Sequence, residues 1–133
     1  MNRLAVIITS ELNNINKVED FIERTIKEFK LSENLRGKIT LAVIEAVNNS
    51  ILYGNKQNPQ KLVKLTAFKG HQRVIFTVED GGEGFDFNNI PDPTTPENLI
   101  KVRGRGLFLM KKLTNELLFV QNGSKVIMTF SIE

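Results

Sequence analysis

Three short segments of this chain carry residue types that could bind a ligand or take part in catalysis. The first holds an acid and an amide, Glu45 and Asn49, which a helix would place on one face because they are four residues apart. The second, Asp80–Phe85, follows an apolar strand pattern and puts one carboxylate into a glycine-rich turn. The third, Gly104–Leu107, places two glycines and an arginine before an amphipathic run, where a helix N-terminus could bind an anion. Together they indicate a nucleotide site.

The acid and the amide of the first segment suit different tasks. The neighbours of Glu45 are apolar nearly all round the helix, so we expect this helix to be buried. An unpaired buried carboxylate is costly, so we expect Glu45 to line a polar cavity. The alternative is a surface carboxylate on an ordinary helix. Asn49, one turn further on, offers a neutral oxygen of the kind that Mg²⁺ accepts as a ligand.

The glycine-rich segments give weaker signals when each is taken alone. Asp-Gly is common in ordinary turns, but three glycines among positions 81–84 exceed what a turn needs and indicate close approach of a ligand. Gly104 and Gly106 complete neither G-x-x-x-x-G-K-[ST] nor G-x-G-x-x-G. Arg103 and Arg105 could be solvated charges or could reach phosphate oxygens.

The elements that must position these segments follow from periodicity and turn signals. We expect strands at Leu4–Thr9, Lys61–Lys69, Arg73–Val78, Leu117–Gln121 and Lys125–Ile132, and helices at Lys17–Phe29, from about 35 to Tyr53, and at Gly106–Glu116. Asn16 and Glu19 fit a capping box, Asn122-Gly123 predicts a hairpin, and the proline-rich stretch from Phe87 to Val102 is expected to be an irregular lid loop. This order predicts an α+β fold, a two-layer sandwich with three helices on one face of a mixed, mostly antiparallel sheet.

Composition limits the class of protein. A chain of 133 residues with 41% hydrophobic residues suits one domain over residues 1–133. The absence of cysteine and the presence of one histidine exclude disulfides, thiolate metal sites and most histidine-based catalysis. The N-terminal apolar run is too short to span a bilayer and lacks a cleavage site, so we expect a cytoplasmic protein without membrane attachment. A dispersed net charge of +3 does not favour direct nucleic-acid binding.

In this order and spacing, the three segments resemble the motifs of GHKL-type ATPases, and among these the anti-sigma factor serine/threonine kinases. The resemblance extends from Leu4 to Ile132. Glu45–Asn49 matches the N box, while Asp80–Phe85 and Gly104–Leu107 match the two G boxes. Asp92–Leu99 is similar to the lid sequence of that subfamily.

The resemblance implies a histidine kinase-like ATPase fold with ATP and Mg²⁺ as cofactors. Glu45 would be the catalytic general base, Asn49 the Mg²⁺ ligand, and Asp80 the acceptor for the adenine amino group. The other positions implied to contact the nucleotide are Gly82, Gly84, Arg103, Gly104, Arg105, Gly106 and Leu107.

The resemblance also implies partners. Members of the subfamily phosphorylate a serine of a small anti-anti-sigma protein of the STAS type and sequester a sigma factor, often as homodimers. Two other functions stay open for this chain. One is a non-catalytic, nucleotide-gated binding module of the same fold. The other, the detached catalytic domain of a histidine kinase, is disfavoured because no dimerisation helix with a phosphoacceptor histidine is found and His71 falls at a predicted hairpin tip.

Overall fold

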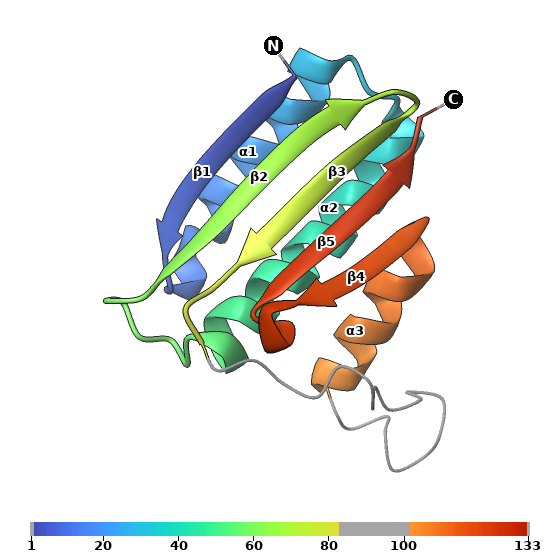
Figure 1. Cartoon of the computed structure of the whole chain (residues 1–133). Helices are drawn as coiled ribbons and strands as arrows, with labels where there is room; N and C mark the ends of the chain where they lie inside the picture. The colour runs from blue at the N-terminus through green and yellow to red at the C-terminus, as the bar shows by residue number, and fades with distance from the viewer. Residues whose placement is uncertain (1, 83–101, 133) are drawn as a thin grey trace.

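The computed structural model describes residues 2–82 and 102–132, and within them a five-stranded sheet packs against three helices (Figure 1). The strands are β1 Arg3–Thr9, β2 Leu62–Gly70, β3 Arg73–Glu79, β4 Glu116–Val120 and β5 Lys125–Ser131. The helices are α1 Ile15–Phe29, α2 Glu33–Asn49 and α3 Val102–Leu113. Two 3₁₀ turns, Leu12–Asn14 and Gln121–Gly123, and a π-helical segment, Ser50–Gly54, complete the described elements.

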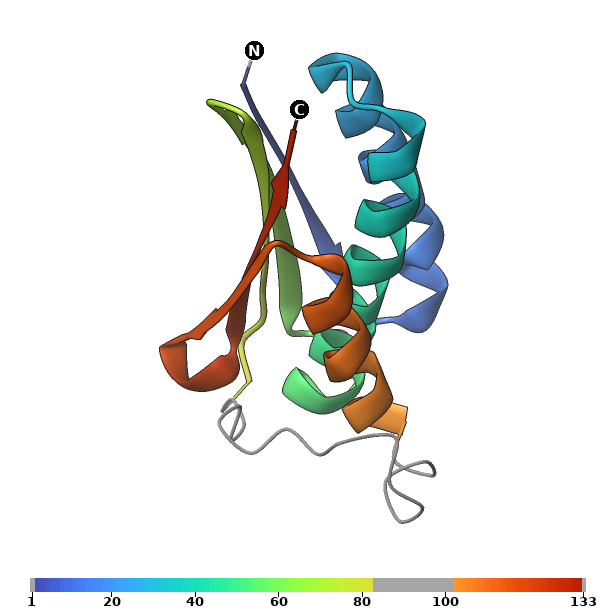
Figure 2. The same ribbon diagram turned by 90° about the vertical axis from the view of Figure 1, so that its right-hand side faces the viewer.

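The two layers separate cleanly, because all three helices cover one face of the sheet (Figure 2). Side chains of the central strands alternate accordingly, and the buried residues beneath the helices are Val63, Leu65 and Ala67 of β2 and Val74, Phe76 and Val78 of β3. The predicted α+β sandwich is therefore confirmed. Its sheet has the order β1-β2-β3-β5-β4 and is antiparallel in each of these pairings, rather than mixed, because β5 inserts between β3 and β4.

The first helix begins earlier than its sequence predicts. Its start follows a 3₁₀ turn in which the Asn14 side-chain nitrogen donates to the Thr9 carbonyl oxygen at 3.0 Å. No side chain caps α1, and Asn16 already lies inside it. The capping box of Asn16 and Glu19 is therefore wrong, because the end of β1 and the Asn14 side chain fix the entry to the helix.

The second helix carries the acid and the amide of the first motif. Ser32 caps its N-terminus, since Leu35 N–H donates to Ser32 Oγ at 3.2 Å. The π-helical segment continues it to Gly54, as predicted. The expectation that this helix is buried all round is wrong, because Leu41 keeps 53% of its surface exposed and Glu45 is half-buried. The outer side of α2 faces solvent, which puts Glu45 at the edge of the core.

The third helix and the last hairpin differ from prediction in their bounds. Val102 begins α3, four residues before the predicted start, so Gly104 and Gly106 lie within its first turns. Val120 pairs with Lys125, which leaves a four-residue connection rather than a tight Asn-Gly turn. The predicted hairpin is confirmed. Residues 87–101 of the expected lid lie outside the described residues.

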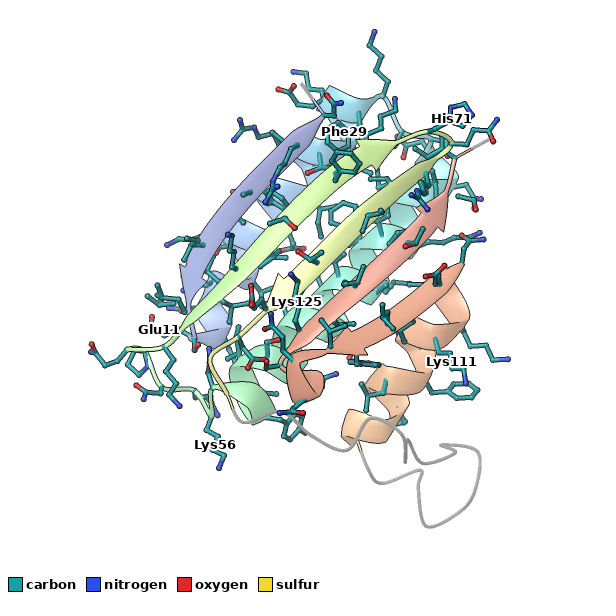
Figure 3. All side chains as sticks on the ribbon, in the orientation of Figure 1. Glu11, Phe29, Lys56, His71, Lys111 and Lys125 are labelled. Atoms are coloured by element: carbon teal, nitrogen blue, oxygen red, sulfur yellow. The ribbon has the colours of Figure 1, made fainter. Side chains whose placement is uncertain are left out.

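His71 occupies the turn between β2 and β3, as predicted. It is exposed, at the opposite end of the sheet from the π-helical segment (Figure 3). Within the described part of the chain, no helix combines the length and apolar character needed to cross a bilayer.

Replacing Gly37 with alanine is expected to stabilise the protein by about 0.5–1 kcal/mol. Gly37 lies on the exposed side of α2, and a Cβ there would meet no heavy atom within 4 Å. Alanine loses less backbone entropy on folding, so the gain needs no new contact. Urea unfolding of the two proteins measures the difference. A loss of stability would contradict the open surroundings of Gly37.

Candidate active site

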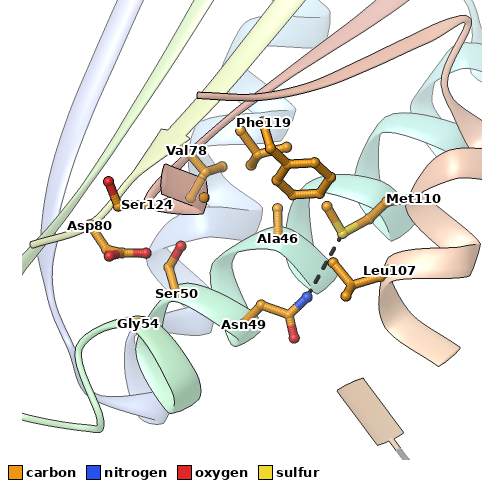
Figure 4. Close-up of a pocket in the computed structure, with 12 residues that line it drawn as sticks. Ala46, Asn49, Ser50, Gly54, Val78, Asp80, Leu107, Met110, Phe119 and Ser124 are labelled. Carbon is orange, nitrogen blue, oxygen red and sulfur yellow. Dashed lines mark hydrogen bonds between the residues drawn. The ribbon is translucent and has the colours of Figure 1, made fainter. Parts of the chain in front are cut away.

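A pocket opens where the end of α2, the end of β3, α3 and the β4–β5 hairpin meet (Figure 4). It holds about 370 Å³ of space free of protein atoms, part of it open to solvent. Its lining consists of Ala46, Asn49, Ser50, Gly54, Val78, Asp80, Leu107, Met110, Phe119, Gly123, Ser124 and Val126. Three of the predicted site residues, Asn49, Asp80 and Leu107, are therefore brought together here.

The pocket has an apolar part and a polar part. Val78, Met110 and Phe119 gather on one side, while Asp80 and Ser124 lie on the other (Figure 4). Such a division suits a flat, largely apolar ligand with hydrogen-bonding groups at one edge. A nucleotide base has this character.

Asp80 is held in place by its own turn. Its backbone N–H donates to the Ser124 carbonyl oxygen at 2.9 Å, and its Oδ1 accepts from Gly82 N–H at 2.7 Å. Gly54 lies so close that a Cβ built on it would overlap the Asp80 carboxylate. The carboxylate is thus confined by the end of the π-helical segment before any ligand binds.

Gly82 has a structural reason to be glycine. A Cβ built on it would overlap the backbone carbonyl of Gly54, so the turn can approach the π-helical segment only without a side chain at this position. The surplus of glycine in the second motif is therefore explained in part by contact within the protein. The predicted approach of Gly82 to a nucleotide stays a prediction.

Asn49 presents an oxygen at the pocket. Its Nδ2 contacts Met110 Sδ at 3.9 Å, and its Oδ1 points away from Met110 (Figure 4). A neutral amide oxygen is a suitable donor for Mg²⁺, which is commonly held by one or two protein ligands together with substrate phosphates. The donor chemistry of Asn49 therefore fits the cation that the motif implies.

Glu45 and Gly106 bring the first and third motifs into contact. A Cβ built on Gly106 would lie 2.6 Å from Glu45 Oε2 and 3.8 Å from Asn49 Nδ2. Gly106 is buried, so α2 and α3 pack closely at this point. Glu45 itself is half-buried on the seam between the helices and is not part of the pocket lining. The polar cavity expected around Glu45 therefore stays a prediction, since this carboxylate lies beside Gly106, next to the lining residue Leu107.

Four predicted residues remain, namely Gly84, Arg103, Gly104 and Arg105. Arg105 is exposed on α3 and is not among the lining residues. Arg103 and Gly104 belong to the first turn of α3, and their side-chain environment is outside the described part of the structure. Gly84 lies outside the described residues altogether.

Several residues that line the pocket are not predicted from the sequence. Ser50 and Gly54 follow Ala46 at intervals of four, so helical spacing could have pointed to them. Phe119 and Ser124 come from the β4–β5 hairpin, and no local pattern marks them as functional. They reach the pocket because β5 pairs with β3, which sequence periodicity does not reveal.

Comparison with known proteins identifies the family. Residues 8–130 match the family model of the histidine kinase-like ATPase domain. The chain belongs to this family. The resemblance drawn from the three motifs is confirmed. In this histidine kinase-like ATPase domain, Glu45 and Asn49 lie on α2, and Gly106 of α3 packs against them.

Two relatives are informative about this histidine kinase-like ATPase domain. It is 30% identical over 91 residues to the anti-sigma F factor of Bacillus cytotoxicus, a match covering 65% of this chain and 61% of that protein. The match thus spans about three fifths of the curated relative. The fold is similar to the crystal structure of the RsbU and RsbW domains of Rv1364c from Mycobacterium tuberculosis, with a TM-score of 0.64, 16% identity, and coverage of 100% of this chain and 32% of that chain. At this identity, the structural likeness supports the fold alone.

Proposed function

We propose that this protein is an ATP-dependent anti-sigma regulator. It phosphorylates a serine or threonine of a STAS-type anti-anti-sigma partner and sequesters a sigma factor in the cytoplasm. The observation that carries the proposal is the convergence of the three motifs: Asp80 and Asn49 share one pocket, and Glu45 touches Gly106 beside it. The similarity to an anti-sigma F factor supports this choice among the functions of the family.

The pocket suits ATP as the phosphoryl donor. Asp80 accepts a hydrogen bond from the adenine amino group, and the apolar side formed by Val78, Met110 and Phe119 packs against the ring. Asn49 would hold Mg²⁺ through its amide oxygen. The bound ion would supply positive charge to offset the charge on the phosphates.

Glu45 is the group proposed to activate the partner. It accepts the proton of the serine or threonine hydroxyl while the hydroxyl oxygen forms its bond to the γ-phosphorus. The bond between the γ-phosphorus and the β–γ bridging oxygen breaks, and ADP leaves. A half-buried carboxylate at the α2–α3 seam suits this task, because a hydroxyl on another protein must be able to reach it.

The test of the nucleotide assignment is base selectivity. Wild-type protein is expected to bind ATP about 10²-fold more tightly than GTP, because guanine presents a carbonyl oxygen where adenine presents an amino group. Asp80→Asn keeps an oxygen that can accept from Gly82 N–H but adds an amide N–H, which can donate to the guanine carbonyl oxygen. The ratio of ATP affinity to GTP affinity is therefore expected to fall by about tenfold or more. Calorimetry with each nucleotide and Mg²⁺ measures both affinities.

The matched control for Asp80→Asn is Glu116→Gln, which removes one negative charge from an exposed position at the start of β4. It should leave the ATP:GTP ratio unchanged. Equal affinity of the wild-type protein for ATP and GTP would overturn the assignment of Asp80 to the adenine amino group.

One observation favours a second function, a non-catalytic module in which nucleotide binding controls partner affinity. Glu45 lies outside the pocket lining, so nucleotide binding does not itself require this carboxylate. Such a module would bind Mg-ATP with the same selectivity but would transfer no phosphoryl group. Transfer to a STAS partner separates the two functions.

A further inference from the structure

Asn55 connects three segments that are distant in the sequence. Its side chain is buried, with 1% of the residue exposed. Its Nδ2 donates to Ser10 Oγ at 2.7 Å and to the Leu62 carbonyl oxygen at 3.0 Å. Its Oδ1 accepts from Gly81 N–H at 2.9 Å. Both donors and the acceptor of one amide are thereby used, as a buried polar group requires.

The groups that accept hydrogen bonds from the Asn55 side chain are themselves held by other contacts. Ser10 is fully buried at the end of β1, and its Oγ donates to the Lys61 carbonyl oxygen at 2.7 Å. The backbone N–H of Asn55 donates to the Ser50 carbonyl oxygen at 2.8 Å and closes the π-helical segment. These contacts fix Asn55 relative to β1, the start of β2 and the end of α2.

The acceptor side of Asn55 reaches the second motif. Gly81 N–H belongs to the peptide that follows Asp80, and a peptide group is planar, so holding this N–H also holds the Asp80 carbonyl. On the other side of Asp80, its own N–H is held by the Ser124 carbonyl oxygen. The backbone of Asp80 is therefore clamped at both of its peptides.

We propose that Asn55 is a positioning residue for base recognition. By holding the Asp80–Gly81 peptide, it sets the place of the Asp80 carboxylate in the pocket and so determines the selectivity for the base. Gly54, the preceding residue, acts with it by leaving room for that carboxylate. The inference rests on the proposed function, since it assigns a residue to the selectivity of the same site.

A purely structural role for Asn55 would predict a different outcome. Loss of its buried hydrogen bonds would then lower stability and change the affinities for ATP and GTP in proportion. Ser10→Ala is the matched control, because it removes a partner from the donor side of Asn55 and leaves the contact with Gly81 in place.

The first experiment compares the ATP:GTP affinity ratio of wild type, Asn55→Ala and Ser10→Ala by calorimetry, at a temperature where all three are folded. Asn55→Ala is expected to lower the ratio by about tenfold, whereas Ser10→Ala changes it by less than about twofold although it also loses stability. Asn55→Asp keeps an oxygen for Gly81 N–H and loses the donors, so it should retain more of the selectivity than Asn55→Ala. If Asn55→Ala does not fold, the ATP:GTP affinity ratio of Asn55→Asp tests the inference in its place.

The second experiment needs no nucleotide. Hydrogen exchange at the Gly81 amide, followed by NMR in the nucleotide-free protein, should be faster in Asn55→Ala than in wild type and unchanged in Ser10→Ala. Wild-type protein that binds no ATP would overturn the proposed function, while the Gly81 amide would still report whether Asn55 positions the turn. Unchanged Gly81 exchange together with an unchanged ATP:GTP ratio in a folded Asn55 variant would overturn the inference.

Discussion

Replacing Glu45 with glutamine is expected to lower phosphoryl transfer to a STAS partner by about 10²–10⁴, the usual contribution of a general base. The affinity for ATP should change by less than about twofold, because Glu45 lies beside Gly106 and outside the lining of the pocket. Glutamine has nearly the same shape as glutamate, so the packing between α2 and α3 is kept while the basic group is lost. Transfer measured at saturating ATP and at several partner concentrations checks the result.

Asn49→Ala provides the contrasting variant for Glu45→Gln. It removes the amide oxygen at the pocket, so it should weaken Mg-dependent ATP binding. At saturating Mg-ATP it should retain more of the wild-type transfer rate than Glu45→Gln does. If Glu45 were only a structural residue, Glu45→Gln would alter thermal stability and activity together. A folded and fully active Glu45→Gln protein would end the general-base assignment and favour the nucleotide-gated binding module.

Most of the fold could be predicted from the sequence, because its local signals agree with one another. The strands alternate with period two, and the helical runs keep their spacing. The observed start of α3 differs from the predicted start for a physical reason. Gly104 and Gly106 have low helix propensity, which indicates a break, yet close packing against α2 favours glycine at Gly106 and the helix continues through it.

The burial of α2 also differs from the prediction, because of its position in the fold. Its run of apolar residues predicts burial on every side, but a helix in an outer layer has one side toward solvent, and Leu41 lies on it. That layer position depends on all three helices sharing one face of the sheet (Figure 2), which composition does not fix. The same position leaves Glu45 half-buried rather than fully enclosed. This agrees with its proposed role, because a general base must be reachable by the hydroxyl group of a partner protein.

The candidate site could be predicted only where its residues have distinctive chemistry. Asp80 and Asn49 stand out by type and spacing, and both line the pocket. Gly54 and Asn55 resemble an ordinary helix end in the sequence, and their importance follows from contacts with residues about 26 positions away in the second motif. Such contacts arise from the sheet order, so no local pattern could have indicated them.

Gly106→Ala is expected to slow phosphoryl transfer by about 10²-fold with only a small loss of stability. The added Cβ would lie 2.6 Å from Glu45 Oε2, a non-bonded distance too short to persist. Because this atom ends a flexible side chain, the carboxylate rather than the backbone is expected to move. A displacement of about 1 Å is enough to impair a general base, and the better helix propensity of alanine offsets part of the strain. Gly37→Ala, on the open side of α2, is the matched control and should leave transfer unchanged.

A double-mutant cycle shows whether Gly106→Ala acts through Glu45. In the Glu45→Gln protein, whose side chain no longer acts as a base, Gly106→Ala is expected to lower transfer by less than about threefold further. An equal effect in both backgrounds would contradict this route and would instead favour a direct contact between Gly106 and the phosphates. That alternative also predicts weaker ATP binding in Gly106→Ala, which calorimetry on the single variant measures independently of the partner.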